Sequence, residues 1–307
     1  MANYYLAADG GGTKTDVICA DEQGTVIGKG SSGPTNLTST SVGAASFNLN
    51  EAVRQALEPI IDANPNFVCF AMGLAGLDTD EEIAVAKDIF VRALSHYNIG
   101  EMLVVNDSQI ALENGSSAKN AVVLISGTGS IAYGRNEREK SVKTGGMDYL
   151  LTDQGSGYYI GRQVLREAVK SYDGRREKTV LEHMVCEYFR INSIAELKQH
   201  VYNPPLTKIE VAQLAKVCSQ AYQQGDEVAA DIFDHAIDEL ELHVQVVIEK
   251  LGLQTTPFEL VLSGAVVQLD HVQSLLLERL KESYPNIKVI TPTQPPVFGA
   301  LKLALGV

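Results

Sequence analysis

The sequence has few cysteines, and none is placed as a metal ligand would be. They are Cys19, Cys69, Cys186 and Cys218. The four are widely spaced, form no C-x-x-C pair and have no histidine at metal-ligand spacing. We therefore expect each to behave as a small buried residue in a reducing compartment, and a cysteine-bound cluster within one chain is disfavoured.

Long apolar runs and basic patches are also missing. No run approaches the roughly 18 residues of a transmembrane helix, and no basic segment opens the chain as in a signal peptide. Lys and Arg number 25 against 38 Asp and Glu, which gives a net charge of -13. An acidic chain is poorly suited to a nucleic-acid backbone. We expect a soluble cytoplasmic protein whose partners include neither nucleic acid nor membrane.

Strand and helix patterns alternate along the 307 residues, which are enough for two domains. The first third has strand patterns at 4–8 and 16–20 and a helix pattern over 41–61. From about residue 121 the pattern restarts with strand, glycine-rich turn and strand. The sequence therefore predicts an α/β protein with two lobes, residues 1–115 and 116–307, and a ligand between them.

Three consecutive glycines in "ADGGGTKTD" separate the first two strand patterns. Glycine permits positive φ and lets backbone N–H groups approach an anion without a Cβ in the way. Gly11, Gly12, Thr13 and Lys14 are therefore candidate phosphate-binding residues. Asp9, at the end of the preceding strand, could hold a hydrated Mg²⁺ against the phosphates. For this turn alone, an ordinary hairpin is the alternative.

Two further small-residue turns follow strands in the second half. The turn in "LISGTGS" contains Gly127, Thr128, Gly129 and Ser130, and the turn in "LSGAV" contains Gly264 and Ala265. The first could bind phosphates as above, and the second could let a flat base approach the backbone. The first turn is not a Walker A motif, because Thr13 and not glycine precedes Lys14. The second turn is not a Rossmann fingerprint, because Gly134 interrupts the helix that should follow it.

The motifs "DGGGTKTD", "NDSQIALENG", "LISGTGS", "LSGAV" and "PPVFGALKLA" are similar, in order and spacing, to those of the actin/hsp70/sugar-kinase superfamily. Over nearly its whole length the chain resembles the branch of N-acetylglucosamine kinases and BadF/BadG/BcrA/BcrD ATPases. The resemblance implies two ribonuclease-H-like lobes, the second with helical insertions, that close on ATP and Mg²⁺. It makes the first two turns phosphate loops and the third an adenosine loop, and it implies a homodimer.

Asp107 is the candidate catalytic base. It follows an apolar strand and opens a short helix, so its carboxylate should point into the cleft and accept the proton of an attacking hydroxyl. The alternative is a helix N-cap, for which Asn106 or Asp107 would serve.

The resemblance also implies contacts to the sugar, besides those of Asp107. The residues concerned are Asn36, Gly76, Gly145, Gly146 and Asp153. Asn36 could instead stabilise its own turn. The segment "GGMDYLLTDQGS" departs from the family pattern G-G-W-G-x-x-x-G-D-E-G-S at Met147, Asp148, Thr152 and Gln154. These departures leave the identity of the sugar open.

The sequence therefore predicts ATP-dependent phosphorylation of an amino sugar. N-acetylglucosamine, giving the 6-phosphate, comes first, and glucosamine or N-acetylmuramic acid are alternatives. An ATPase activator of a CoA-thioester reductase or dehydratase is a second class, although no cysteine lies where its cluster ligand is expected. A non-catalytic sugar sensor is a third. His235 and His243 share a predicted long helix and are expected to be surface or packing residues.

Overall fold

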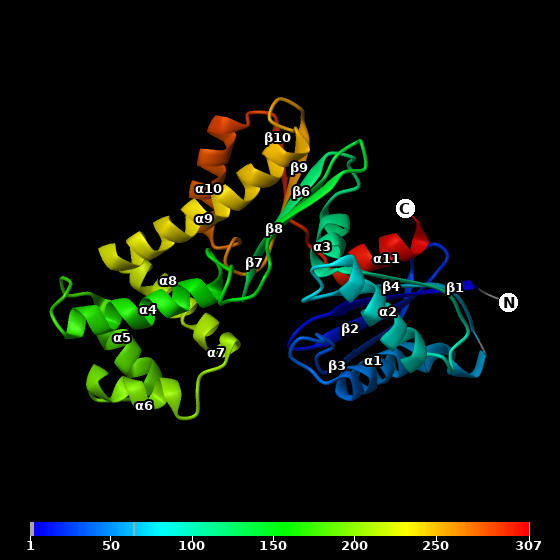
Figure 1. Ribbon diagram of the computed structural model, residues 1–307, viewed down its shortest axis with the longest axis horizontal. Coiled ribbons are helices and arrows are strands. Elements are labelled where there is room, and N and C mark those ends of the chain that lie inside the picture. Colours follow the sequence, from blue (N-terminus) through cyan, green and yellow to red (C-terminus); the bar gives the residue numbers. More distant parts are fainter. Residues whose placement is uncertain (1–2, 64, 307) are drawn as a thin grey trace.

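The computed structural model describes residues 3–63 and 65–306 and has two lobes, each built on a five-stranded sheet (Figure 1). The first sheet has the order β3-β2-β1-β4-β5. Its strands are β1 (Asn3–Gly10), β2 (Thr15–Asp21), β3 (Val26–Ser32), β4 (Asn66–Leu74) and β5 (Ile99–Asn106). The second has the order β10-β9-β6-β7-β8. Its strands are β6 (Ala121–Ser126), β7 (Ser130–Arg135), β8 (Ser141–Gly145), β9 (Phe258–Ser263) and β10 (Ile287–Ile290).

The two sheets repeat one topology. In the first sheet, β1, β2 and β3 pair antiparallel, and β4 and β5 continue parallel from β1. The second sheet pairs β6, β7 and β8 antiparallel and adds β9 and β10 parallel to β6. The predicted α/β class and the internal duplication are therefore confirmed.

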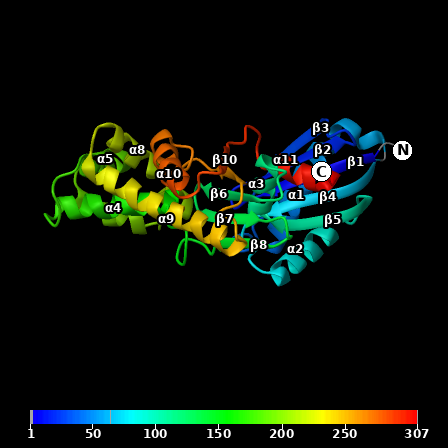
Figure 2. The same ribbon diagram turned by 90° about the horizontal axis from the view of Figure 1, so that it is seen from above.

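Helices cover both sheets, and most of them belong to the second lobe. The first half of the chain forms α1 (Val42–Leu57), the 3₁₀ helix η1 (Glu58–Ala63), α2 (Asp80–Ala93) and α3 (Asp107–Gly115). The second half forms α4 (Gly157–Tyr172), α5 (Val180–Phe189), η2 (Ile194–Glu196), α6 (Leu197–Tyr202), α7 (Lys208–Gln213), α8 (Ala215–Gln223), α9 (Glu227–Leu251), α10 (Asp270–Ser283) and α11 (Val297–Leu305). Figure 2 shows α4, α5 and α8 at one end of the molecule and β1 at the other.

Local sequence signals account for the main helix boundaries. Thr79 caps α2, and Glu82 completes a capping box with it. The 25-residue helix α9 begins after Asp226, whose side chain accepts from Ala229 N–H, and it ends at Gly252 in the left-handed conformation. Because this helix supplies one long apolar face, it packs along the second sheet and carries much of that lobe's core.

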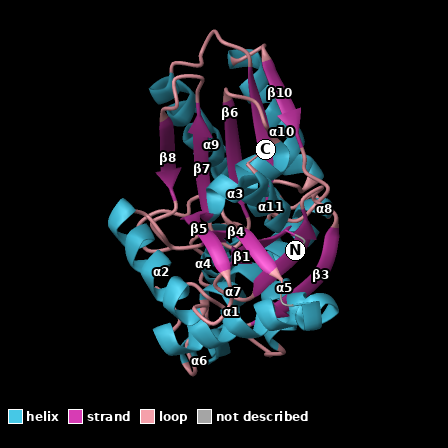
Figure 3. Ribbon diagram, turned by 90° about the vertical axis from the view of Figure 1, so that its right-hand side faces the viewer, coloured by secondary structure: helices cyan, strands magenta, loops and turns pink. Residues whose placement is uncertain are grey.

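The helices α3 and α11 lie between the two sheets (Figures 1 and 3). Ile110 of α3 packs with Ala300 of α11 in one apolar cluster, whereas Leu112 packs with Val123 of the second sheet in another. A Cβ on Gly299 would lie 1.8 Å from Ile110 O, so only glycine permits this approach of the two helices.

The C-terminal helix returns to the first lobe. Leu301 of α11 belongs to the same cluster as Ala7 of β1 and Ile18 of β2. The placement of this helix, open in the sequence, is therefore settled by its packing on the first sheet. The division into residues 1–115 and 116–307 stays a prediction, but α11 does not accompany the second sheet.

Candidate active site

The first glycine turn joins β1 to β2 and leaves space on one side. Gly11 N–H donates to Lys14 O at 2.9 Å. Gly10, Gly11 and Gly12 all have negative φ, so backbone strain is not what requires them. A Cβ on Gly10 would lie 2.4 Å from Thr35 Oγ1, whereas a Cβ on Gly12 would meet nothing closer than Asn36 Nδ2 at 3.9 Å. Gly10 is therefore needed for packing, and Gly12 borders open space that an anion could enter.

The second and third turns lie against each other at the corresponding edge of the second sheet. Gly264 has a φ of +101°, and a Cβ there would lie 2.4 Å from Ser126 O. That carbonyl oxygen accepts from Val266 N–H at 2.9 Å. A Cβ on Gly127 would lie 3.9 Å from Gly264 Cα, while Thr128 and Ala265 are exposed. The predicted second phosphate loop and adenosine loop thus form one continuous backbone surface.

Ser130 uses both of its donors inside the protein. Its hydroxyl donates to Gln154 O at 2.6 Å, and its backbone N–H donates to Asp153 Oδ1 at 3.1 Å. The residue is 2% exposed. Of the two hydroxyls predicted for phosphate binding in this turn, that of Thr128 is the exposed one.

Asp9 lies at the end of β1 among other carboxylates. In the sheet register it is opposite Asp16, and Lys14 pairs with Asp16 at 2.6 Å. Burial, followed by the charges of Asp107 and Asp16, raises the pKa of Asp9 to about 7, and Lys14 opposes the rise. A cluster of carboxylates with little compensating charge fits a hard divalent cation such as Mg²⁺, which prefers oxygen ligands and retains several waters.

Asn106, and not Asp107, provides the side-chain cap of helix α3. The Asn106 side chain accepts from Ser108 N–H at 2.9 Å and donates to Leu77 O at 2.7 Å. Asn106 therefore accepts the hydrogen bond of a free N–H group in the first turn of the helix. From the sequence alone, Asp107 was an equally good candidate for this cap. The adjoining carboxylate is available for chemistry.

Asp107 lies close to charged groups of both lobes. Burial is the largest influence and raises its pKa, and Asp78 raises it further. The N–H of Ser108 and the ammonium of Lys143 lower it. Lys143 belongs to β8, and its Nζ lies 2.5 Å from Asp78 Oδ1, in the loop after β4. The candidate base is thus placed where the two lobes meet.

Asn36 and Gly76 lie side by side next to the first turn. Asn36 Oδ1 accepts from Thr38 N–H at 2.9 Å and from the Thr38 hydroxyl at 2.7 Å, so the side chain does stabilise its own turn. Its Nδ2 faces Gly12, as the 3.9 Å approach shows. Gly76 has a φ of +78°, and a Cβ there would lie 2.8 Å from Asn36 Oδ1. These contacts place the predicted sugar contacts of the first lobe beside the first glycine turn.

Gly145 and Gly146 end β8 beside Ser130, in left-handed conformations at φ of +75° and +79°. A Cβ on Gly145 would lie 2.7 Å from His243 Cε1, and Gly146 N–H donates to Ser130 O at 3.2 Å. Burial lowers the pKa of His243, and Asp153 raises it. The sequence predicted His243 to be a surface or packing residue, yet it packs directly against the segment predicted to bind sugar.

Asp153 is buried against the second glycine turn. It is 3% exposed and has a φ of +66°. Its Oδ1 accepts from Ser130 N–H, and its Oδ2 lies 2.7 Å from Lys208 Nζ. Lys208 begins α7, far along the chain, and no local signal in the sequence points to it. The same is true of Lys143, because both lysines reach the site only through the tertiary fold.

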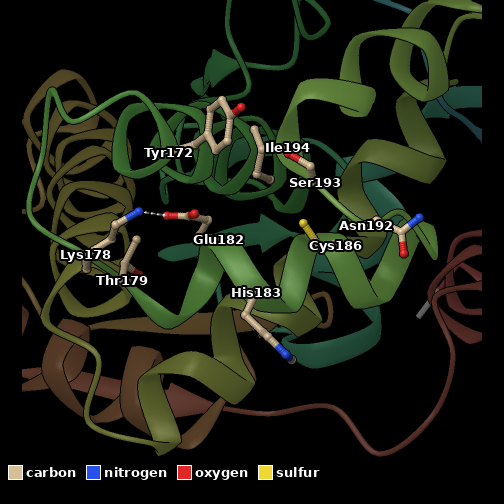
Figure 4. Close-up of a pocket in the computed structure, with 9 residues that line it drawn as sticks. All are labelled: Tyr172, Lys178, Thr179, Glu182, His183, Cys186, Asn192, Ser193 and Ile194. Atoms are coloured by element: carbon tan, nitrogen blue, oxygen red, sulfur yellow. Dashed lines mark hydrogen bonds and ion pairs between the residues drawn. The ribbon is translucent and has the colours of Figure 1, made fainter.

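Other features of the described residues lie apart from this region. Cys19, Cys69 and Cys218 are buried and Cys186 is half-buried, all as free thiols. A separate hollow borders α4, α5 and η2 and contains Tyr172, Cys186 and the ion pair between Lys178 and Glu182 (Figure 4). It includes none of the predicted site residues.

No helix in the described part of the chain is long and apolar enough to cross a membrane.

Comparisons with known proteins identify the family of this chain. The model of the BadF/BadG/BcrA/BcrD ATPase family matches residues 8–304. The chain is 33% identical over 302 residues to the N-acetylmuramic acid/N-acetylglucosamine kinase of Clostridium acetobutylicum, covering 98% of both chains. It is 31% identical to the N-acetyl-D-glucosamine kinase of Dictyostelium discoideum, covering 98% of this chain and 97% of the relative.

Solved structures share the fold. A structure from Chromobacterium violaceum superimposes with a TM-score of 0.77 at 20% identity, covering 98% of each chain. A ROK family glucokinase from Streptomyces griseus, solved with glucose and AMPPNP, superimposes with a TM-score of 0.62 at 17% identity, covering 99% of this chain and 100% of that chain. Two lobes with the turns and carboxylates described above, and a family match over almost the whole length, lead to one conclusion: the chain belongs to the BadF/BadG/BcrA/BcrD ATPase family.

Proposed function

We propose that this protein is an ATP-dependent kinase of amino sugars, with N-acetylglucosamine as the first candidate acceptor and the 6-phosphate as its product. Glucosamine and N-acetylmuramic acid are the alternatives. The single observation that carries the proposal is the Asp107 carboxylate, which lies where the two lobes meet while Asn106 serves as the helix cap. The names of the relatives from Clostridium acetobutylicum and Dictyostelium discoideum, both kinases of such sugars, support it.

In this proposal the glycine turns bind ATP. Gly11, Gly12, Thr13 and Lys14 take one side of the phosphates, while Gly127, Thr128 and Gly129 take the other. Ser130, whose N–H and hydroxyl both donate within the protein, shapes this turn and does not touch the phosphates. Gly264 and Ala265 border the adenosine. The exposure of Gly12 and Thr128 supports this, because an anion can approach the backbone of both turns from solvent.

Asp107 would act on the acceptor. Its carboxylate accepts the proton of the attacking sugar hydroxyl while that oxygen bonds to the γ-phosphorus, and the bond from this phosphorus to the β-bridging oxygen breaks to release ADP. A raised pKa makes the Asp107 carboxylate a stronger base toward the proton of the sugar hydroxyl. Asp9 would hold Mg²⁺ through water, and the metal would neutralise phosphate charge. Asn36, Gly76, Gly145, Gly146 and Asp153 would hold the sugar.

The test is ADP release with ATP and Mg²⁺ against N-acetylglucosamine, glucosamine, N-acetylmuramic acid, glucose and no sugar. Turnover that requires one amino sugar and falls about 10²- to 10⁴-fold in Asp107→Asn would support the proposal. Hydrolysis indifferent to every sugar would overturn it in favour of an ATPase activator. A cytoplasmic location, where ATP is available, and a homodimer belong to the same proposal.

A further inference from the structure

Lys208 connects two carboxylates of the segment predicted to bind the sugar. It is the first residue of α7, whose N-terminus is capped by Thr207. Its Nζ lies 2.6 Å from Asp148 Oδ1 and 2.7 Å from Asp153 Oδ2. The same ammonium lies 5.8 Å from the ring centroid of Tyr149, which adds a favourable electrostatic contact.

The contact with Asp148 accounts for a departure from the family pattern, in which glycine stands at this position. Asp148 has a φ of +67°, a conformation that favours glycine, although aspartate tolerates it better than most residues. Its carboxylate faces the Lys208 ammonium, and the pKa of Asp148 falls despite the opposing effect of burial. The ion pair thus compensates for the strain of an aspartate at a glycine position.

The loop between the two aspartates is also closed from within. Thr152 replaces a second family glycine, and its Oγ1 accepts from Met147 N–H at 2.8 Å. Thr152 N–H in turn donates to Asp148 O at 2.9 Å. The loop therefore has a defined shape, and Lys208 forms ion pairs with the aspartates at both of its ends, Asp148 and Asp153.

Lys208 is the charged partner of the buried Asp153 carboxylate. The Asp153 side chain is 4% exposed, and a carboxylate so deeply buried needs a compensating cation. Lys208 Nζ is the cation that touches it, while Ser130 N–H holds the other oxygen. Without the ammonium, Asp153 Oδ2 would lose its charged partner, and the carboxylate would no longer be held in its present position.

We propose that Lys208 is a positioning residue for acceptor recognition, which holds the Asp153 carboxylate in the orientation in which it can accept hydrogen bonds from the sugar. This inference rests on the proposed function. The cluster has one cation against two carboxylates, so it suits the hydroxyl or amide donors of the acceptor.

The experiment compares Lys208→Met and Lys208→Arg with the wild-type protein in steady-state kinetics. Lys208→Met is expected to raise the KM for N-acetylglucosamine about ten- to hundredfold, because a charged contact to Asp153 is lost, with the KM for ATP unchanged. Lys208→Arg should restore most of the affinity. Lys216→Met, at an exposed lysine of α8, is the matched control and should leave both constants unchanged.

A further variant separates the two ion pairs of Lys208. Asp148→Gly restores the family residue at a left-handed position and leaves Lys208 paired with Asp153. It should change the KM for the sugar by less than about threefold. An unchanged sugar KM in a folded Lys208→Met, or an equal rise in the KM for ATP, would overturn the inference. The second result would mean that Asp153 only supports the phosphate turn through Ser130.

Calorimetric titration with N-acetylglucosamine separates this inference from the proposed function. Wild-type protein that binds the sugar without turnover would contradict the kinase, while weaker binding by Lys208→Met would still support the role of Lys208. Turnover with an unaffected Lys208→Met would contradict only the inference. Wild-type protein that binds none of the amino sugars would overturn both.

Discussion

Lys143 and Asp78 join the two lobes directly beside the candidate base: Lys143 Nζ lies 2.5 Å from Asp78 Oδ1 and 3.3 Å from Asp78 O. One residue belongs to β8 of the second sheet, and the other to the loop that follows β4 of the first. Because both charges also act on Asp107, the relative position of the lobes influences the ionisation of that carboxyl.

Replacing Lys143 by Met is expected to move the acidic limb of the pH profile of kcat/KM to higher pH. The ammonium lowers the pKa of Asp107, and its loss also leaves the charge of Asp78 uncompensated, so both effects raise that pKa. The base is then protonated over a wider pH range. The measurement is initial rate against pH at limiting sugar.

Two further variants control this experiment. Lys119→Met, at an exposed lysine in the turn before β6, should leave the profile unchanged. Adding Asp78→Asn to Lys143→Met should move the acidic limb part of the way back. A profile of Lys143→Met that matches the wild type would show that the interlobe pair does not act on the base.

Asn106 and Asp107 are neighbours, but we expect substitution of Asn106 to lower stability and substitution of Asp107 to lower activity. Asn106→Ala removes the α3 cap and should destabilise the fold by about 1 kcal/mol. Asp107→Asn should lower kcat about 10²- to 10⁴-fold. It should not lower stability, because the folded protein raises the pKa of Asp107 and therefore disfavours its ionised form. Urea unfolding and kcat measured on both variants check this, and a large loss of stability in Asp107→Asn would contradict it.

The sequence predicted most of the fold because short motifs determine its elements. The turn after β1, the helix beginning near Asp107 and the repeated strand order all follow from glycine placement and apolar patterns near in the chain. The helix α11 could not be placed, because its apolar face fits either lobe until Gly299 is seen against Ile110. Its packing depends on shape and not on local pattern.

The site was predicted less completely than the fold. Residues such as Asp9 and Asp107 stand beside recognisable strand ends, so their types and positions could be read directly. Lys143, Lys208 and His243 lie on β8, α7 and α9, and they reach the site from elements with no motif of their own. Long lysines on amphipathic elements are common, and only the contacts to Asp78 and Asp153 distinguish these two.

Asp9→Asn should stabilise the protein without Mg²⁺ at pH 8 and abolish most of the activity. The pKa of Asp9 is about 7 in the folded state against 3.8 for an aspartate side chain in an unfolded chain. Between these values the folded protein holds a proton that the unfolded chain has lost, so the free energy of unfolding falls as pH rises through this window. Asparagine has no such charge to bury.

Thermal unfolding of wild type and Asp9→Asn from pH 4 to pH 8 measures this effect. The Tm difference should be near zero at pH 4 and reach about 3 °C or more at pH 8. Adding Mg²⁺ with ATP should raise the Tm of the wild type more than that of the variant. A Tm difference that does not vary with pH would rule out the burial of an ionised Asp9 as its cause.

Gly10 and Gly12 allow a matched test of the first turn, because only one of them borders open space. Gly10→Ala would place a methyl group 2.4 Å from Thr35 Oγ1 and 2.7 Å from Met72 Cε, so it should destabilise the fold. Overpacking of this kind costs about 1–3 kcal/mol. Gly12→Ala meets no protein atom closer than 3.9 Å and has a negative φ, so stability should be unchanged.

Nucleotide binding should respond to the two substitutions in the opposite order from stability: Gly12→Ala should weaken it and Gly10→Ala should not. A methyl group on Gly12 occupies the space where phosphates would approach the backbone, so Gly12→Ala should raise the KM for ATP about tenfold or more and leave the KM for the sugar unchanged. Folded Gly10→Ala should bind ATP almost normally, because its methyl group points into the core. Unchanged ATP affinity in Gly12→Ala would mean that the nucleotide does not pass this turn.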